Sequence, residues 1–405
     1  MGSTIQSFQF TTSATYVANG EESTILDESI SNIICKYDYE TKYMPIIYMG
    51  VKIRENLFNI MTKNIDSGSI ILSVYKQAKT EDNVIGKRDL YFRSSFSYFM
   101  PNYIGFSDNK VMKNDDLEQT NIDNSYHDCV LGLYDMNIVN RNGNVENNII
   151  KNSDMISIVN HYTKDLPMLI EPFKDNEKIK TCVIPPNLTI NKLLPYLNSV
   201  HSFYKTSFRY FNDFNLTYLL SNEGNPVKSS DEELDTIIIR IMDHEEFQTK
   251  LFSMEIDNSR KAYVFYIDEK FAGLTVNHLR DKEINRLVCI DSLGNSVETT
   301  LNIPTNENTT EKIKADRINV DNLDYINTIR DDIENTSVML KVVKSTIDSS
   351  ILTPNKEYIV QHHTSNSQYN GRYLLASKQE ILARQSNTFT SSTIFELRKV
   401  MNSKY

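Results

Sequence analysis

Residues 357–383 read EYIVQHHTSNSQYNGRYLLASKQEILA, and this stretch decides the fold class. Tyr358, Val360 and His362 alternate with other residues at the two-residue period of a β-strand. Asn370-Gly371 is the strongest turn signal of the chain, typical of a type I′ hairpin, and a second strand-like run begins at Arg372. The last quarter of the chain is therefore expected to be antiparallel β-structure that forms a small closed or half-closed barrel.

A strand–helix–strand order occurs twice in the sequence. The first copy has apolar strand patterns at 46–51 and 70–75, with a short amphipathic helix predicted over 55–63 between them. The second copy has strand patterns at 237–241 and 263–267 around a short helix predicted over 245–254. An Ile-Asp pair precedes the last strand in both copies. Two interpretations stay open: an internal duplication, or a chance likeness in a chain rich in Ile and Asn.

These patterns predict a β-rich α+β protein with two similar antiparallel β-barrel-like domains and a mixed α/β middle segment. The polar, Ser/Thr-rich start is interpreted as an arm that needs a partner surface to become ordered. Residues 107–127 and 302–321 are polar and are expected to be surface loops. The expected domains are an N-terminal arm (1–28), a first barrel-like domain (29–150), the middle segment (151–230) and a second barrel-like domain (231–405) with a helical excursion around 305–335.

Composition excludes several classes of protein. The 405 residues carry a formal net charge of −10, which argues against a protein that grips phosphates or an anionic membrane. No apolar run approaches the roughly 20 residues that a membrane-spanning helix needs, and residues 1–10 lack the pattern of a secretory signal. The four cysteines are scattered without a C-x-x-C pair, as expected for buried thiols in a reducing cytosol.

No pattern of residues predicts catalysis. His244-Glu245-Glu246 begins like a zincin motif, but Gln248 stands where the second His is needed, so His244 is interpreted as a surface residue at a helix start. His362 and His363 are adjacent on a predicted strand and should point to opposite faces. A Cys129/His127 pair is better explained by packing. We therefore predict no catalytic residue, no cofactor and no metal site.

The most informative stretch is aromatic: residues 196–220 read YLNSVHSFYKTSFRYFNDFNLTYLL. One interpretation is the core of a domain. The other is that part of this surface is an oligomer or partner interface, where Tyr and Phe are enriched. The sequence leaves both open.

Together with the paired prolines before it, this stretch resembles the baseplate hub proteins of contractile phage tails and of related phage-tail-like injection machines. The early run YMPIIYMGV and the C-terminal stretch quoted above also look like parts of such hubs. The resemblance rests on short strings and patterning. Its middle part is carried by Pro185, Pro186, Tyr196, Leu197, Asn198, Phe203, Tyr204, Phe211, Asp213, Phe214 and Tyr218, of which all but Leu197 and Asn198 are the structural-signature or interface candidates.

The resemblance implies a homotrimeric ring in which two similar domains per chain present six quasi-equivalent units. Such a ring joins a hexameric tail tube to a trimeric central spike and leaves a channel for DNA, which would meet the protein only in transit. The implied partners are a second and third copy of the chain, the tube protein, the spike protein and other baseplate or tape-measure proteins. No membrane insertion is implied, and the location is the virion tail baseplate after synthesis in the host bacterial cytoplasm. Two alternatives stay open: a tail-associated peptidoglycan hydrolase or endopeptidase, and a receptor-binding or scaffold protein outside the axial ring.

Overall fold

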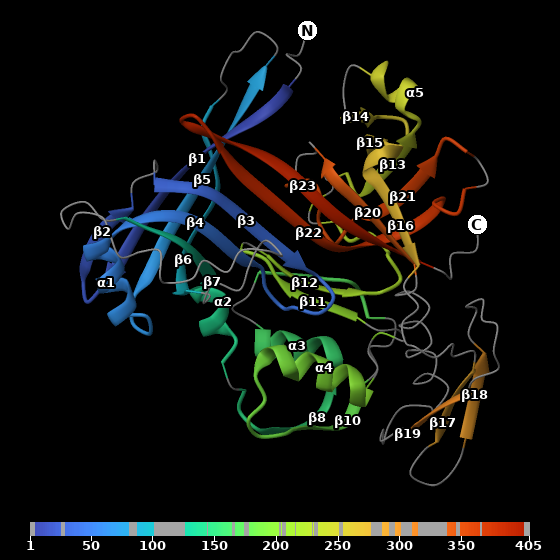
Figure 1. Ribbon diagram of the computed structural model, residues 1–405. Coiled ribbons are helices and arrows are strands. Elements are labelled where there is room, and N and C mark those ends of the chain that lie inside the picture. Colours follow the sequence, from blue (N-terminus) through green and yellow to red (C-terminus); the bar gives the residue numbers. More distant parts are fainter. Residues whose placement is uncertain are drawn as a thin grey trace. The chain divides into compact units, whose positions relative to one another are not determined.

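The structure is a computed structural model, and its strands are organised in two compact units (Figure 1). The first unit combines residues 1–37, 45–140 and 379–393, and the second combines 38–44, 141–378 and 394–405. The residues that the structure describes are 5–25, 29–80, 87–100, 126–143, 145–163, 167–173, 178–201, 204, 208–214, 216–228, 230, 234–250, 254–276, 286–290, 296–300, 310–314, 338–345, 349–364 and 367–400.

The first unit is a closed antiparallel barrel of eight strands. The order around the barrel is β3–β4–β7–β6–β5–β1–β23–β22, and β22 pairs with β3 to complete the circle. The closing pair β22 and β23 comes from the far end of the chain, and only the parts 379–385 and 388–393 belong to this unit. The strands are β1 (Ile5–Ala18), β3 (Ile30–Asp38), β4 (Ile46–Arg54), β5 (Ser69–Thr80), β6 (Asp89–Phe99), β7 (Tyr126–Asp135), β22 (Gly371–Gln385) and β23 (Thr388–Lys399).

Alternation along these strands explains the barrel. In β4 the side chains of Ile47, Met49 and Val51 are buried while their neighbours Tyr48 and Lys52 face outward. In a closed barrel, one face of every strand points inward and fills the interior with apolar side chains. The two-residue period of these strands is consistent with that arrangement. The buried set also includes Phe10, Ala14, Tyr16, Ile33, Cys35, Ile70, Leu72, Val74, Phe92, Phe96, Leu131, Leu133, Leu382 and Phe389.

The prediction that the N-terminal residues form an arm is wrong. Residues 5–25 form β1 and the short strand β2 (Glu21–Ile25), and β1 pairs with β5 along nearly its whole length. The arm was predicted because this segment is rich in Ser and Thr. Small and hydroxyl-bearing residues such as Thr12 and Ala14 point into the barrel and are buried there, so the strand carries little apolar bulk. The short helices α1 (Glu55–Lys63), as predicted, and α2 (Met136–Arg141) follow β4 and β7.

The main sheet of the second unit has the order β14–β15–β13–β21–β22–β23–β20–β16. It differs from the expected antiparallel barrel in two respects. β13 is parallel to both of its neighbours, β15 and β21, and the end strands β14 and β16 are not paired with each other among the described residues. The elements are β13 (Thr236–Met242), α5 (His244–Gln248), β14 (Met254–Asp257), β15 (Ala262–Asp268), the 3-10 helix η3 (Glu269–Phe271), β16 (Ala272–Val276), β20 (Val338–Ser345) and β21 (Glu357–His362).

The strand–helix–strand order is present in the first place where the sequence predicted it, and in part in the second. There the helix predicted over 245–254 ends at Gln248, and the strand β14 lies between it and β15. The pairing differs, however. β13 and β15 are hydrogen-bonded neighbours, whereas β4 and β5 are separated by β7 and β6 in the first barrel. The two copies therefore share a similar order of helix and strands along the chain, but their strands are paired differently in the two sheets. The β-rich class with a closed antiparallel barrel is confirmed.

The second unit also holds the mixed segment expected between the barrels. Helices α3 (Met155–Thr163) and α4 (Ile190–His201) lie side by side over the ribbon of β8 (Asn148–Asp154) and β10 (Lys178–Ile184) (Figure 1). Their apolar faces meet in a core that includes Ile158, Leu194 and Leu197. A small sheet of β9 (Met168–Ile170), β11 (Phe208–Asn212) and β12 (Thr217–Ser221) contains the second half of the aromatic stretch, in which β11 and β12 are antiparallel.

A further small sheet contains β17 (Arg286–Ile290), β18 (Ser296–Thr300) and β19 (Thr310–Lys314), in which β17 is antiparallel to β18 and parallel to β19. Most of the predicted loop at 107–127 and most of the expected helical excursion around 305–335 lie outside the described residues; within the latter, 310–314 form β19. Every helix among the described residues is too short or too polar to cross a bilayer.

Candidate functional site

The residues of the aromatic signature are divided between core and surface. Tyr204, Phe211 and Tyr218 are at most 5% exposed and belong to the interior of the second unit. Tyr196, Asp213 and Phe214 are half-buried, as is Pro185, while Pro186 is exposed. Phe203 lies outside the described residues. The buried rings therefore act as core, and an interface role stays a prediction for the exposed and half-buried members.

Tyr204 connects two backbone segments of this core. Its hydroxyl lies 2.7 Å from the carbonyl oxygen of Glu171 and 3.0 Å from that of Leu219, and it can donate its one proton to either. Burial, with the nearby Glu171 carboxylate as a smaller cause, raises the pKa of Tyr204, so the phenol stays protonated and remains a donor. The side chain fixes the end of β9 against β12.

Replacing Tyr204 by Phe should lower the free energy of unfolding by about 1–2 kcal/mol, because two buried carbonyl oxygens lose their shared donor while the ring packing is kept. Chemical denaturation measures this change. Tyr126→Phe, at a 48% exposed position, is the control and should change stability by less than about 0.5 kcal/mol. Equal effects of the two substitutions would contradict the assigned role of the Tyr204 hydroxyl.

A buried pair of charged residues lies beside Tyr204. The Glu171 carboxylate accepts hydrogen bonds from the backbone and hydroxyl of Ser221 and from Asn225. Arg209 donates to the carbonyl oxygens of Ser221, Pro354 and Leu375. Burial and then the charge of Arg398 lower the pKa of Arg209 to about 10, so the guanidinium is still charged at neutral pH. No sequence pattern predicts this network, because its members are far apart along the chain.

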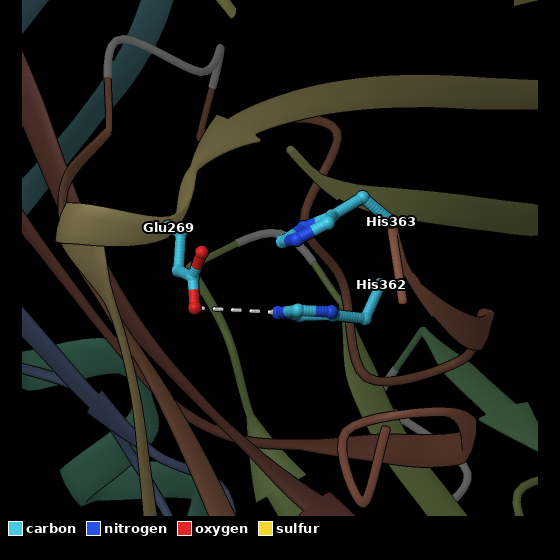
Figure 2. Close-up of side chains that lie close together, drawn as sticks. All are labelled: Glu269, His362 and His363. Carbon is cyan, nitrogen blue, oxygen red and sulfur yellow. Dashed lines mark ion pairs between the residues drawn. The ribbon is translucent and has the colours of Figure 1, made fainter. Parts of the chain in front are cut away.

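A second group of polar residues lies where three parallel strands end. His362 is the last residue of β21, His363 follows it, and Glu269 follows β15 as the first residue of η3. One ligand atom from each of these three side chains lies within 4.8 Å of the other two. Figure 2 shows the Glu269 carboxylate and both imidazole rings directed toward one another.

The expectation that His362 and His363 face opposite sides of a strand is wrong. β21 ends at His362, and the amide of His363 makes the last hydrogen bond of the parallel ladder, to the carbonyl oxygen of Ile241. The chain bends at His363 and Thr364, and the two rings lie 4.2 Å apart between centroids. The alternation rule does not hold where a strand ends.

His244 begins α5 as predicted, and its side chain is 43% exposed. The structure adds a partner that the sequence did not suggest: its Nδ1 lies 2.6 Å from Oδ2 of Asp268, the last residue of β15. The amide of Lys270 and the His244 ring, both directed at the carboxylate, lower the pKa of Asp268. The Nε2 of His244 lies 2.9 Å from the side-chain amide nitrogen of Gln248, the residue that stands where a zincin motif has its second His.

Cys129 does not have the environment of a catalytic thiol. Its Sγ lies 3.6 Å from the carbonyl oxygen of His127, while the His127 ring stacks on Phe58 at 4.3 Å. Burial and then the charge of Asp128 raise the pKa of Cys129 to about 11. A nucleophilic cysteine needs a lowered pKa, so this pair offers packing rather than an activated thiolate.

Comparison with solved structures identifies the fold. The tail protein from Neisseria meningitidis MC58 is similar to this chain with a TM-score of 0.55, at 8% sequence identity, covering 96% of this chain and 97% of that one. The 43 kDa tail protein of prophage MuSo2 from Shewanella oneidensis is similar with a TM-score of 0.54, at 9% identity, covering 96% of both chains. This chain has the fold of phage tail proteins. No protein-family model matches the sequence, and no curated protein matches it.

The two tail proteins match the chain over almost its full length, so the likeness includes both units. At identities below 10%, few of the side chains are shared. What is common is therefore the arrangement of strands and helices, while the Glu269/His362/His363 group and the Arg209 network are described for this chain alone.

Proposed function

We propose that this chain is a structural hub of a phage tail baseplate, a homotrimeric ring that adapts a hexameric tail tube to a trimeric central spike. The observation that carries the proposal is the likeness of its fold, over nearly all of both chains, to two phage tail proteins. The closed antiparallel barrel of the first unit agrees with the barrel-like domain that the sequence resemblance implies.

The symmetry argument supports three copies. A closed ring repeats the same contacts about its axis, so three chains can face a sixfold object only if each chain presents two comparable surfaces. Each unit has a main sheet of eight strands among the described residues, and β22 and β23 contribute to both sheets. The parallel pairs of β13 make the second sheet a variation on the first, so the sixfold match would be approximate.

The proposed role is mechanical and needs no catalysis. The proposed partners are further copies of this chain, the tube protein, the spike protein and other baseplate or tape-measure proteins, within the virion tail. The net charge of −10 favours a channel that DNA crosses without binding, because like charges avoid the counterion release that drives DNA association.

Image averages of the purified protein, alone and with tube and spike proteins, test the ring. The proposal predicts threefold particles with a central opening, and single chains in every mixture would contradict it. Retention of DNA by the ring in low salt would contradict the passive channel separately, without affecting the assignment of the ring.

A further inference from the structure

The carboxyl ends of three neighbouring parallel strands carry the polar residues described above. In the register of the sheet, Met242 of β13 lies beside Asp268 of β15, and Ile241 lies beside His362 of β21. Side chains that follow parallel strands gather at one edge of a sheet, which is a common position for ligand sites. Here that edge holds Glu269, His362 and His363 in one group.

We propose that Glu269, His362 and His363 bind a divalent transition-metal ion of the Zn²⁺ type. Two imidazole nitrogens and one carboxylate oxygen are a ligand set that Zn²⁺ accepts, with water completing the tetrahedron. Harder ions such as Mg²⁺ and Ca²⁺ prefer oxygen ligands throughout. The ion would connect the end of β15 to the end of β21, two strands that are separated in the sheet by β13.

The distances suit this assignment. Nε2 of His362 lies 3.6 Å from Oε1 of Glu269, which is too long for a hydrogen bond. Two ligands bound about 2.0–2.1 Å from one tetrahedral ion lie roughly 3.4 Å apart. The present separation is therefore close to that of two atoms on a shared ion. The third ligand atom, from His363, needs only a small rotation of an exposed side chain, because all three atoms are already within 4.8 Å of one another.

The burial of His362 is the second, independent observation. Its side chain is 6% exposed, and Nε2 is a buried nitrogen without a hydrogen-bond partner. Buried polar atoms nearly always make hydrogen bonds, so a buried nitrogen that faces a carboxylate oxygen at 3.6 Å without a hydrogen bond leaves room for an ion between the two atoms. The ring is also held in place, since Tyr369 stacks on it at 5.0 Å with the planes only 10° apart.

Metal binding would move one proton within the His362 ring. The amide of Thr364 donates to Nδ1 at 3.1 Å, so the neutral ring without metal carries its proton on Nε2. With an ion on Nε2, the proton sits on Nδ1, and the Thr364 amide must exchange this bond for one to water. The number of protons on the ring is unchanged, and the Thr364 amide becomes a specific reporter of binding.

Titration of the full chain with Zn²⁺, after removal of metals by a chelator, tests the proposal by calorimetry and thermal denaturation. We expect one strong site per chain and an upward shift of the midpoint of thermal unfolding. Glu269→Gln, at a 49% exposed side chain, should weaken Zn²⁺ binding at least ~10-fold without disturbing the fold, and His362→Gln should do the same. His161→Gln removes an exposed histidine outside the group and is the matched control.

Two readouts separate this site from ordinary surface histidines. Co²⁺ should give ligand-field absorption that the Glu269→Gln variant loses, and the NMR signal of the Thr364 amide should shift on addition of Zn²⁺. Absence of a strong site, or Zn²⁺ affinity that is equal in the unchanged chain and in the Glu269→Gln variant, would overturn the proposal and leave Glu269 and His362 as an ion pair. Neither result bears on the baseplate assignment.

Discussion

Replacing Phe389 by Ala should destabilise the first unit by about 3–5 kcal/mol, as measured by chemical denaturation. Phe389 lies on β23 with no exposed surface, and it pairs with Phe10 of β1 across the barrel seam. The guanidinium of Arg384 on β22 lies 5.6 Å from the centre of its ring. The substitution removes a large buried ring from the point where the two ends of the chain meet.

The closure of the barrel explains why the expected destabilisation by Phe389→Ala is large. β22 and β23 are the only strands that join β3 to β1 among the described residues, so a weakened seam exposes the edges of both. Leu90→Ala, at a 56% exposed position on β6, removes apolar atoms without opening the barrel and should cost less than about 0.5 kcal/mol. A loss below about 1 kcal/mol for Phe389→Ala would show that the C-terminal hairpin does not close the N-terminal barrel.

Replacing Arg209 by Met should cost the second unit about 3–5 kcal/mol, because the loss of a buried charge leaves its partners unpaired. The carbonyl oxygens of Ser221, Pro354 and Leu375 lose their donor. The carboxylates of Glu40 and Glu171, whose charges raise the pKa of Arg209, also lose a nearby positive charge. Met has a similar length, so the change is mainly electrostatic.

Arg260→Met is the matched control for this prediction. Arg260 is 56% exposed, and its Nε lies 3.8 Å from an oxygen of Asp257, so it is an ordinary surface ion pair. Such pairs contribute less than about 1 kcal/mol. Denaturation curves that are the same for both variants would mean that the three carbonyl contacts of Arg209 contribute nothing to stability.

Local periodicity predicted much of the fold, because many elements bury one regular face. The helix at 55–63 was predicted with its observed bounds, and the strand patterns at 46–51 and 237–241 lie within β4 and β13. The pairing partners of β22 and β23 could not be predicted in this way. Their contacts with β3 and β1 join residues more than 300 positions apart, and a strand pattern does not name its neighbour.

The type I′ turn at Asn370-Gly371 shows where a short motif misled. Val360 pairs with Gly371, so the connection between β21 and β22 is longer than two residues. The Asn370 side chain accepts from the amide of His362 instead of taking a left-handed turn position. The tight connection comes later, between Gln385 and Thr388, where Ser386 has a φ of 55°. Ser386 and Asn387, which form this connection, are a weaker sequence signal for a tight turn than Asn-Gly.

The Glu269/His362/His363 group was missed for a related reason. Each member looked unremarkable in sequence, since His362-His363 read as two faces of a strand and Glu269 stood in a different segment. Only the parallel pairing of β15, β13 and β21 places the three at one edge. Parallel neighbours with long connections leave no local sequence signal for such a meeting.

Native mass spectrometry of the purified chain tests the hub assignment most directly, because the threefold ring is its central requirement. Three chains of 46.8 kDa give a particle of about 140 kDa, and this mass is expected across a dilution series or on addition of the tube and spike proteins. A particle that stays at the mass of one chain under all of these conditions would contradict the account.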